Sequence, residues 1–397
     1  MFKSIFFINI FFSSLYILVI GISQIEIKIV NIFSVLSVIY IIFFYLIRDY
    51  RFNYSIKNIK LFLIVLLILF FLYPYSIYIS PIKFSSFLLY ASLILSLLII
   101  PILLFSWRVI NFSNDQTNYF IKILKFNFYF PIIVILIEFI LSISTSYQAS
   151  QPGAGWFGLD RPGGFFGDCN FSTIWITVIC LLLMILNKNK NPIKNLNFIF
   201  IICLFINIIL QTRLTLFIII LAPFIIFHKE ILGRFWWINY LYLILFFIFS
   251  IKITLDSNML PERFTYDFVN TSRNPRLNDA NMILSELFAD NLEFFGRGLG
   301  TTIELTDRYK WRKFNKVINV GPVYILQDFG YFGAFLFFLL ILFFYQKIYY
   351  RDIKKVFLIM VICNIFHFHF YFPWFWTLIS LLIISDNIIK KHNSIDC

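Results

Sequence analysis

The sequence predicts an all-α polytopic membrane protein with about twelve transmembrane helices, and three observations support this class. Hydrophobic residues make up 60% of the 397 residues, charged residues only 13%, and the mean hydropathy is +0.86. Long apolar runs alternate with short polar segments, a composition that a soluble globule does not have. The basic residues also divide unevenly between alternate polar segments, which is the charge bias that orients helices in a membrane.

Each apolar run of suitable length is a candidate span. The first follows a single basic residue and leads into a charged segment, so we expect a retained helix rather than a cleaved signal. Two short runs flank Arg213, and an arginine near the centre of one long helix is less favourable than a turn between two helices. The candidates are 5–23, 29–47, 61–79, 84–106, 128–147, 171–186, 198–210, 214–227, 236–254, 322–345, 356–370 and 374–388.

The distribution of positive charge supports this count. With a cytoplasmic N-terminus, 19 of the 33 basic residues lie in inner segments and four in short outer segments. The remaining ten lie in or beside one long periplasmic segment, residues 255–320, and long loops are exempt from the bias. Both termini are then cytoplasmic, and residues 1–397 form a single integral membrane domain. The net charge of +13 therefore reflects topology and is poor support for binding of nucleic acid.

Three features meet on the predicted outer face. The segment QPGAGWFGLDRPGGFFGDCN, residues 151–170, holds six of the fourteen glycines beside Arg161. Glycine lets backbone turn and approach a ligand closely, so this segment predicts a shaped binding loop, with Asn170 capping the next helix. The turn at Arg213 and the segment 255–320 lie on the same face. We therefore expect the functional site there, against the outer ends of the helices.

The long outer segment predicts an amphipathic helix over about 275–290. Asn274 as cap, Pro275 at the first position and apolar residues at three- and four-residue spacing favour it. It is expected to lie along the membrane surface, with Asp279, Glu286 and Asp290 facing water. The following FFGRGLGT contains three alternate glycines, but without a preceding strand this pattern is weak evidence for a phosphate site.

Five arginines on the outer side have no explanation in topology. An arginine near hydrocarbon must pair with an acid or face a wet cavity. Any single one is explained equally well by an ion pair with Asp160, Asp168 or Asp279. All five together favour an anionic, lipid-linked substrate, because the planar guanidinium binds phosphate at two points. They are Arg161, Arg213, Arg273, Arg276 and Arg297.

Four segments in order resemble the superfamily of O-antigen polymerases and ligases of bacterial inner membranes, the Wzy and WaaL type. They cover roughly residues 161–335 and read RPGGFFGDCN, QTRLTLF, PRLNDANMILSELFADNLEFFGRGLG and NVGPVYILQDFGYFG. The resemblance implies a GT-C-like fold and a membrane glycosyltransferase that polymerises undecaprenyl-diphosphate-linked repeat units of a surface polysaccharide at the periplasmic face. It implies no metal or other cofactor. The implied partners are the lipid-linked glycan donor and acceptor and the lipid membrane, and a chain-length regulator protein is a further candidate.

By the same resemblance, arginines hold or neutralise the diphosphate, and stabilising its growing negative charge supplies much of the catalysis. The predicted catalytic residues are Arg161, Arg213, Arg276 and Asp328. The predicted substrate-binding residues are Gly164, Asn170, Arg273, Gly298 and Gly300.

The chain departs from the ligase branch at one position. Ligases of the superfamily carry a histidine just before the helix that starts near residue 322, whereas this chain has Asn319-Val320-Gly321-Pro322. This difference favours a polymerase over a ligase that transfers polymer to the lipid A core, and it leaves Asp328, Asp279 and Glu286 as open candidates for the general base.

A flippase for lipid-linked oligosaccharide is the alternative without chemistry. Transporters commonly contain internal repeats, and the sequence holds no second copy of the arginine and glycine loop. The alternating His367 and His369 lie among aromatic residues, which is more typical of an interfacial belt than of a metal site. The five cysteines form no CxxC pair.

Overall fold

The protein is helical apart from one short hairpin in the residues that the structure describes. The computed structural model describes residues 2–14, 19–22, 25–48, 96–104, 106–107, 116–144, 162–164, 168–188, 196–210, 212–226, 281, 284–285, 287–298, 321–366 and 372–395. Three helices in this part are long and apolar enough to cross a membrane, at Thr117–Ser144, Cys169–Lys188 and Pro322–Lys347. The structure is therefore compatible with a helical membrane protein.

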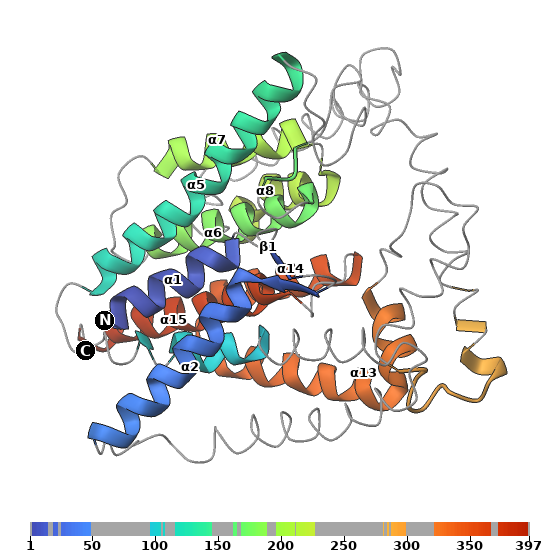
Figure 1. Ribbon diagram of the computed structural model, residues 1–397. Helices are drawn as coiled ribbons and strands as arrows, with labels where there is room; N and C mark the ends of the chain where they lie inside the picture. Colours follow the sequence, from blue (N-terminus) through green and yellow to red (C-terminus); the bar gives the residue numbers. More distant parts are fainter. Residues whose placement is uncertain are drawn as a thin grey trace, which may run out of the picture.

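The helices follow the order of the predicted spans. They are α1 (Phe2–Ser14), α2 (Ile29–Arg48), α5 (Gln116–Ser144), α6 (Cys169–Lys188), α7 (Leu196–Leu210), α8 (Arg213–Ile226), α13 (Gly321–Lys347), α14 (Arg351–Phe366) and α15 (Pro373–Ile395). Figure 1 shows most of them side by side in one bundle.

Most predicted spans agree with these helices. The predicted turn at Arg213 is confirmed, because α7 ends at Leu210 and α8 begins at Arg213. Helix α5 starts twelve residues before the predicted 128, at Gln116. Spans 61–79 and 236–254 lie outside the described residues, and 84–106 is described only at residues 96–104 and 106, which are helical. The count of twelve stays a prediction.

The first predicted span, 5–23, is wrong at its C-terminal end. Helix α1 ends at Ser14, and strand β1 (Val19–Ile22) pairs antiparallel with β2 (Ile25–Lys28), with Val19 opposite Lys28 and Ile22 opposite Ile25. The residues of these strands are mostly β-branched, which favours extended backbone over helix, and only two residues separate the strands. Hydropathy alone did not distinguish this hairpin from the end of a spanning helix.

Helix α6 lies at the centre of the bundle. It contacts α5, α7, α8, α14 and α15, and every side chain from Ser172 to Leu186 is buried. A helix that is apolar on all sides is stable only when other helices surround it. Its rotation is fixed in part by the Trp175 indole N–H, which donates to the Asn127 carbonyl of α5 at 3.0 Å.

The outer helices carry apolar side chains on their exposed faces. On α13, Phe335, Phe338 and Leu342 recur at three- and four-residue spacing and are exposed, and Ile133, Ile137 and Ile140 form the same kind of row on α5. An exposed apolar stripe of this kind needs a nonaqueous partner. These rows are the surfaces that acyl chains would cover in a membrane.

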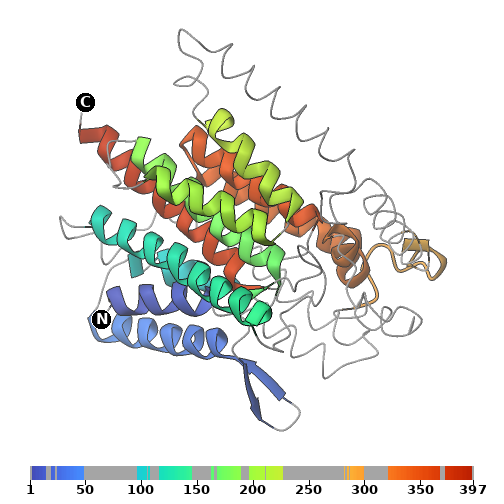
Figure 2. The same ribbon diagram turned by 90° about the horizontal axis from the view of Figure 1, so that it is seen from above.

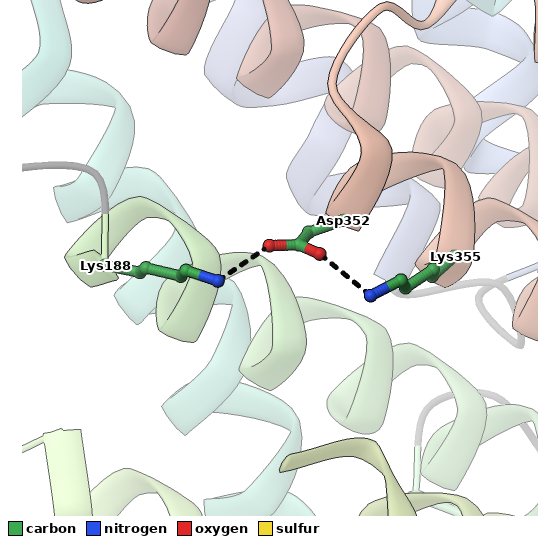
Figure 3. Close-up of polar contacts among 3 residues, drawn as sticks. All are labelled: Lys188, Asp352 and Lys355. Carbon is green, nitrogen blue, oxygen red and sulfur yellow. Dashed lines mark hydrogen bonds and ion pairs between the residues drawn. The ribbon is translucent and has the colours of Figure 1, made fainter. Parts of the chain in front are cut away.

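Ion pairs and caps tie several helices together at one end of the bundle. Asp352, in the first turn of α14, lies 3.0 Å from Lys188 at the end of α6 and 3.1 Å from Lys355 (Figure 3). An acid at a helix N-terminus and a base at a C-terminus both interact favourably with the helix dipoles. Asp386 of α15 accepts from the backbone N–H groups of Tyr349 and Tyr350 at 3.0 and 2.6 Å.

The predicted alternation of spans assigns all of these helix ends to the inner face. Helix α1 also begins, and α15 also ends, at one common end of the bundle in both views (Figure 1, Figure 2).

Candidate functional site

The arginine and glycine loop is fixed at one peptide unit between Gly163 and Gly164. The carbonyl of this peptide accepts from the Ser172 hydroxyl of α6, and its N–H donates to Glu138 Oε2 of α5 at 2.7 Å. Gly164 has a φ of 57°, and a Cβ there would lie 3.0 Å from Ile135 Cγ1, so any side chain at this position would be strained. Two helices therefore hold the backbone three residues after Arg161.

The residue that caps α6 is Asp168, and the prediction that Asn170 does so is wrong. The helix begins at Cys169, and Asp168 Oδ1 accepts from the Asn170 N–H at 2.6 Å. The Asp168 carbonyl also accepts from the Ser172 N–H at 3.1 Å. An aspartate at this position satisfies a free amide and places negative charge at the positive end of the helix. Asn170 is left inside the first turn, half-buried, and its role in substrate binding stays a prediction.

The start of α8 is anchored by a polar network that runs into the centre of the bundle. The Thr212 hydroxyl, directly before Arg213, accepts from the Thr215 hydroxyl at 2.6 Å and donates to Asn207 Oδ1 of α7 at 3.4 Å. Asn207 in turn donates to the Thr177 hydroxyl of α6 at 3.3 Å. Buried polar groups joined in this way fix the position of a helix end, because each lost partner leaves another group unsatisfied. The backbone at Arg213 is therefore held by both neighbouring helices.

Helix α13 is broken at Gly330. This residue has a φ of 64° and a ψ of −167°, which interrupts the helical hydrogen bonds around it. The freed N–H groups of Tyr331 and Phe332 donate instead to the carbonyls of Glu293 and Phe294, at 2.8 and 3.1 Å. Backbone groups in an apolar surrounding must find partners within the protein, and here a loop supplies them. Figure 1 shows the bend of α13 beside the segment that carries this loop.

The same loop, residues 292–298, also satisfies the other side of the break. The carbonyl of Gln327 would accept from Tyr331 in a continuous helix, but here it accepts from the Arg297 N–H at 2.7 Å. The loop backbone therefore replaces the missing helical contacts on both sides of Gly330. We call this contact between loop 292–298 and residues 327–332 the α13 joint.

Two glycines make the α13 joint sterically possible. Gly296 has a φ of 76°, and a Cβ there would lie 2.6 Å from the Gly330 nitrogen. A Cβ at Gly330 would lie 2.4 Å from the carbonyl carbon and oxygen of Phe294. Both positions combine left-handed backbone with a close approach of main chain to main chain, so no side chain fits at either.

The loop that contains the alternate glycines is thus built mainly as a helix contact. The Gly296 N–H donates to the Leu292 carbonyl at 2.7 Å and the Arg297 N–H to Gln327, so these two amides are not available to a phosphate. The Arg297 guanidinium pairs with Asp290, so an ion pair within the protein accounts for this arginine and no phosphate is needed to neutralise its charge. Gly298 is buried with a φ of 102°, and its predicted contact with substrate stays a prediction.

Polar side chains are buried at the α13 joint. Asp328, predicted as catalytic, is 1% exposed, and its neighbour Gln327 is 0% exposed. Neither amide atom of Gln327 has a hydrogen-bond partner within the described part of the chain, and neither does Oε2 of Glu293. Buried amides are rarely left in this state, so Gln327 is unusual.

Two residues with unusual contacts, Glu138 and Gln327, were not among the site residues predicted from the sequence. Glu138 is the single acidic residue inside the predicted span 128–147, and an ionisable residue in a span is a functional candidate in its own right. Gln327 offered a weaker signal, an amide next to an acid near the start of a predicted span.

Several predicted site residues lie outside the described part of the chain. For Arg213 the structure describes the backbone, at the start of α8, but not the side chain. Of the segment 275–290, residues 281, 284–285 and 287–289 are helical. Asp290 is exposed as expected. Of the two adjacent apolar residues in the predicted pattern, Leu287 is buried, whereas Phe288 is exposed. The residues outside the description are Arg161, Arg273, Arg276, Gly300, Asp279, Glu286, His367 and His369.

Comparisons with known proteins add no assignment. No protein-family model matches the chain, and searches of curated proteins and of solved structures find no significant match. The resemblance to the polymerase and ligase superfamily therefore rests on the four motif segments alone, and membership of that superfamily stays a prediction.

The α13 joint predicts an intolerance of alanine at Gly330. Gly330→Ala places an alanine at a φ of 64° and a ψ of −167°, a region that is essentially restricted to glycine and costs about 1–3 kcal/mol, and adds a clash against the Phe294 backbone. We expect a large loss of folded protein in the membrane, measured by fluorescence-detected size-exclusion chromatography. Phe338→Ala, on the exposed face of the same helix, is the control and is expected to fold. Normal folding of Gly330→Ala would contradict the close contact between Gly330 and the Phe294 backbone at the α13 joint.

The bond between Glu138 and Gly164 predicts a difference between two substitutions of the acid. Glu138→Gln keeps an oxygen that accepts from the Gly164 N–H, whereas Glu138→Leu leaves this amide unsatisfied at a cost of about 1–3 kcal/mol. Thermal unfolding in detergent is expected to give a lower Tm for the leucine variant than for the glutamine variant. Equal Tm values for the two would argue against the contact.

Proposed function

We propose that this chain is a GT-C-type membrane glycosyltransferase that polymerises undecaprenyl-diphosphate-linked oligosaccharide repeat units of a surface polysaccharide, at the periplasmic face of the bacterial inner membrane. The observation that carries the proposal is the α13 joint. It joins the third and fourth of the motif segments by backbone hydrogen bonds around the buried Asp328. Segments that resemble one enzyme family in sequence are expected to meet in space if they form one site.

The other two motif segments are also fixed near one another in the bundle. RPGGFFGDCN ends in the first turn of α6, and QTRLTLF opens α8, and these two helices are in contact. Helix α14 contacts both α6 and α8, and it also contacts α13. Helices α6 and α8 are thus in direct contact, and α14 links both of them to α13. These contacts among the helices that carry three of the motif segments support a single site.

The chemistry needs only groups that the chain supplies. A hydroxyl oxygen of the acceptor sugar attacks the anomeric carbon of the donor glycan, and the bond from that carbon to the diphosphate breaks. The electron pair leaves with the diphosphate lipid, whose negative charge Arg161, Arg213 and Arg276 would stabilise. The hydroxyl proton passes to a base, for which Asp328 is the candidate with a described position.

Deletion of the gene in its host tests this function against the alternatives. A polymerase predicts that the surface polysaccharide collapses from a ladder to a single repeat unit on the lipid core, as measured by gel electrophoresis. Polymer that stays on the undecaprenyl carrier would indicate a ligase instead. Loss of both, with repeat units trapped on the inner leaflet, would indicate a flippase, and an unchanged ladder would contradict all three functions.

Arginine variants test the diphosphate site in the complemented deletion strain. Arg213→Ala and Arg276→Ala are expected to abolish the ladder at normal protein levels. Arg213→Lys is expected to fail as well, because an ammonium group does not bind phosphate at two points. Arg297→Lys is the matched control, since a lysine can still pair with Asp290, and it is expected to restore the ladder. Full activity of Arg213→Lys would contradict two-point binding.

A further inference from the structure

The side chain of Gln327 differs from three buried asparagines of the bundle, whose amide nitrogens have a partner. Asn9, Asn127 and Asn207 each donate to the carbonyl four residues earlier on their own helix, at 2.9, 3.0 and 2.8 Å. Gln327 is fully buried, and within the described residues neither its Nε2 nor its Oε1 has a partner. A buried donor and a buried acceptor without partners both destabilise the folded chain. The sequence therefore keeps an unfavourable group at the α13 joint, and a ligand would explain why.

The charges around the joint indicate which ligand chemistry fits. Asp328 follows Gln327 directly, and Glu293 at the same joint has a carboxylate oxygen without a partner in the described chain. Two acids beside the amide disfavour a phosphate, and the Arg297 cation is paired with Asp290. A neutral hydroxyl group donates one hydrogen bond and accepts others, which matches an amide that offers both a donor and an acceptor. The ligand that fits is a sugar rather than a diphosphate.

We propose that Gln327 binds hydroxyl groups of the acceptor sugar at the α13 joint, beside the candidate base Asp328. This inference rests on the proposed function and assigns the acceptor to the joint, whereas the arginines hold the diphosphate of the donor. Gln327 is enclosed in this structure, so the sugar reaches it when loop 292–298 moves away from α13. Three backbone hydrogen bonds hold that loop to α13, and Gly296 and Gly298, both at positive φ, give the loop backbone freedom to rearrange.

The test separates stability from activity through Gln327→Met. Methionine has nearly the same length and shape but no amide, so the unsatisfied donor and acceptor disappear. We expect the full-length protein in detergent to gain roughly 2 °C or more in Tm, while the variant fails to restore the polysaccharide ladder in the deletion strain. The matched control is Asn207→Leu, which removes a buried amide that does have partners and is expected to lower the Tm.

Each outcome of this pair of measurements decides the proposal. A Gln327→Met protein with a raised Tm and a normal ladder would show that the amide has no ligand beyond water, and a lowered Tm would show that it has partners inside the protein. Either result overturns the assignment to the acceptor while the polymerase function still stands. An unchanged ladder on deletion of the gene itself would instead overturn the proposed function, whatever Gln327 does.

Discussion

The requirement that every backbone polar group finds a partner inside an apolar surrounding governs the most unusual part of this protein. Helix α13 is broken at Gly330, and the break frees the N–H groups of Tyr331 and Phe332 and the carbonyl of Gln327. Loop 292–298 satisfies all three with its own backbone. The two close glycines, the position of the loop and the burial of Asp328 all follow from this exchange. A polar site inside a membrane helix is therefore possible without lipid-exposed backbone.

Polar contacts between other helices apply the same constraint on a smaller scale. The peptide between Gly163 and Gly164 is held at its carbonyl by α6 and at its N–H by α5, and Thr212 connects the start of α8 to α7. At the other end of the bundle, Asp352 bridges two lysines from α6 and α14. Apolar packing around α6 holds the helices together, and these polar contacts fix the ends that carry the candidate site residues.

Hydropathy predicted the helices well because a span must be apolar over its length, and the arginine at 213 correctly predicted the division between α7 and α8. Hydropathy failed at residues 19–22, because a β-branched strand can be as apolar as a helix. The prediction that Asn170 caps α6 failed because the capping residue depends on which residue starts the helix, and that start is not fixed by hydropathy. The α13 joint was not predictable from spacing. Its partners are thirty or more residues apart in the sequence. A glycine that breaks a helix also looks the same in sequence as one that packs against a neighbour.

A cryo-EM map of the protein in a lipid nanodisc tests most directly whether loop 292–298 completes a broken α13. We expect helical density that is interrupted at Gly330, with the loop backbone in the gap and the Arg297 amide against the Gln327 carbonyl. A continuous helix through Gly330, with the loop elsewhere, would contradict it.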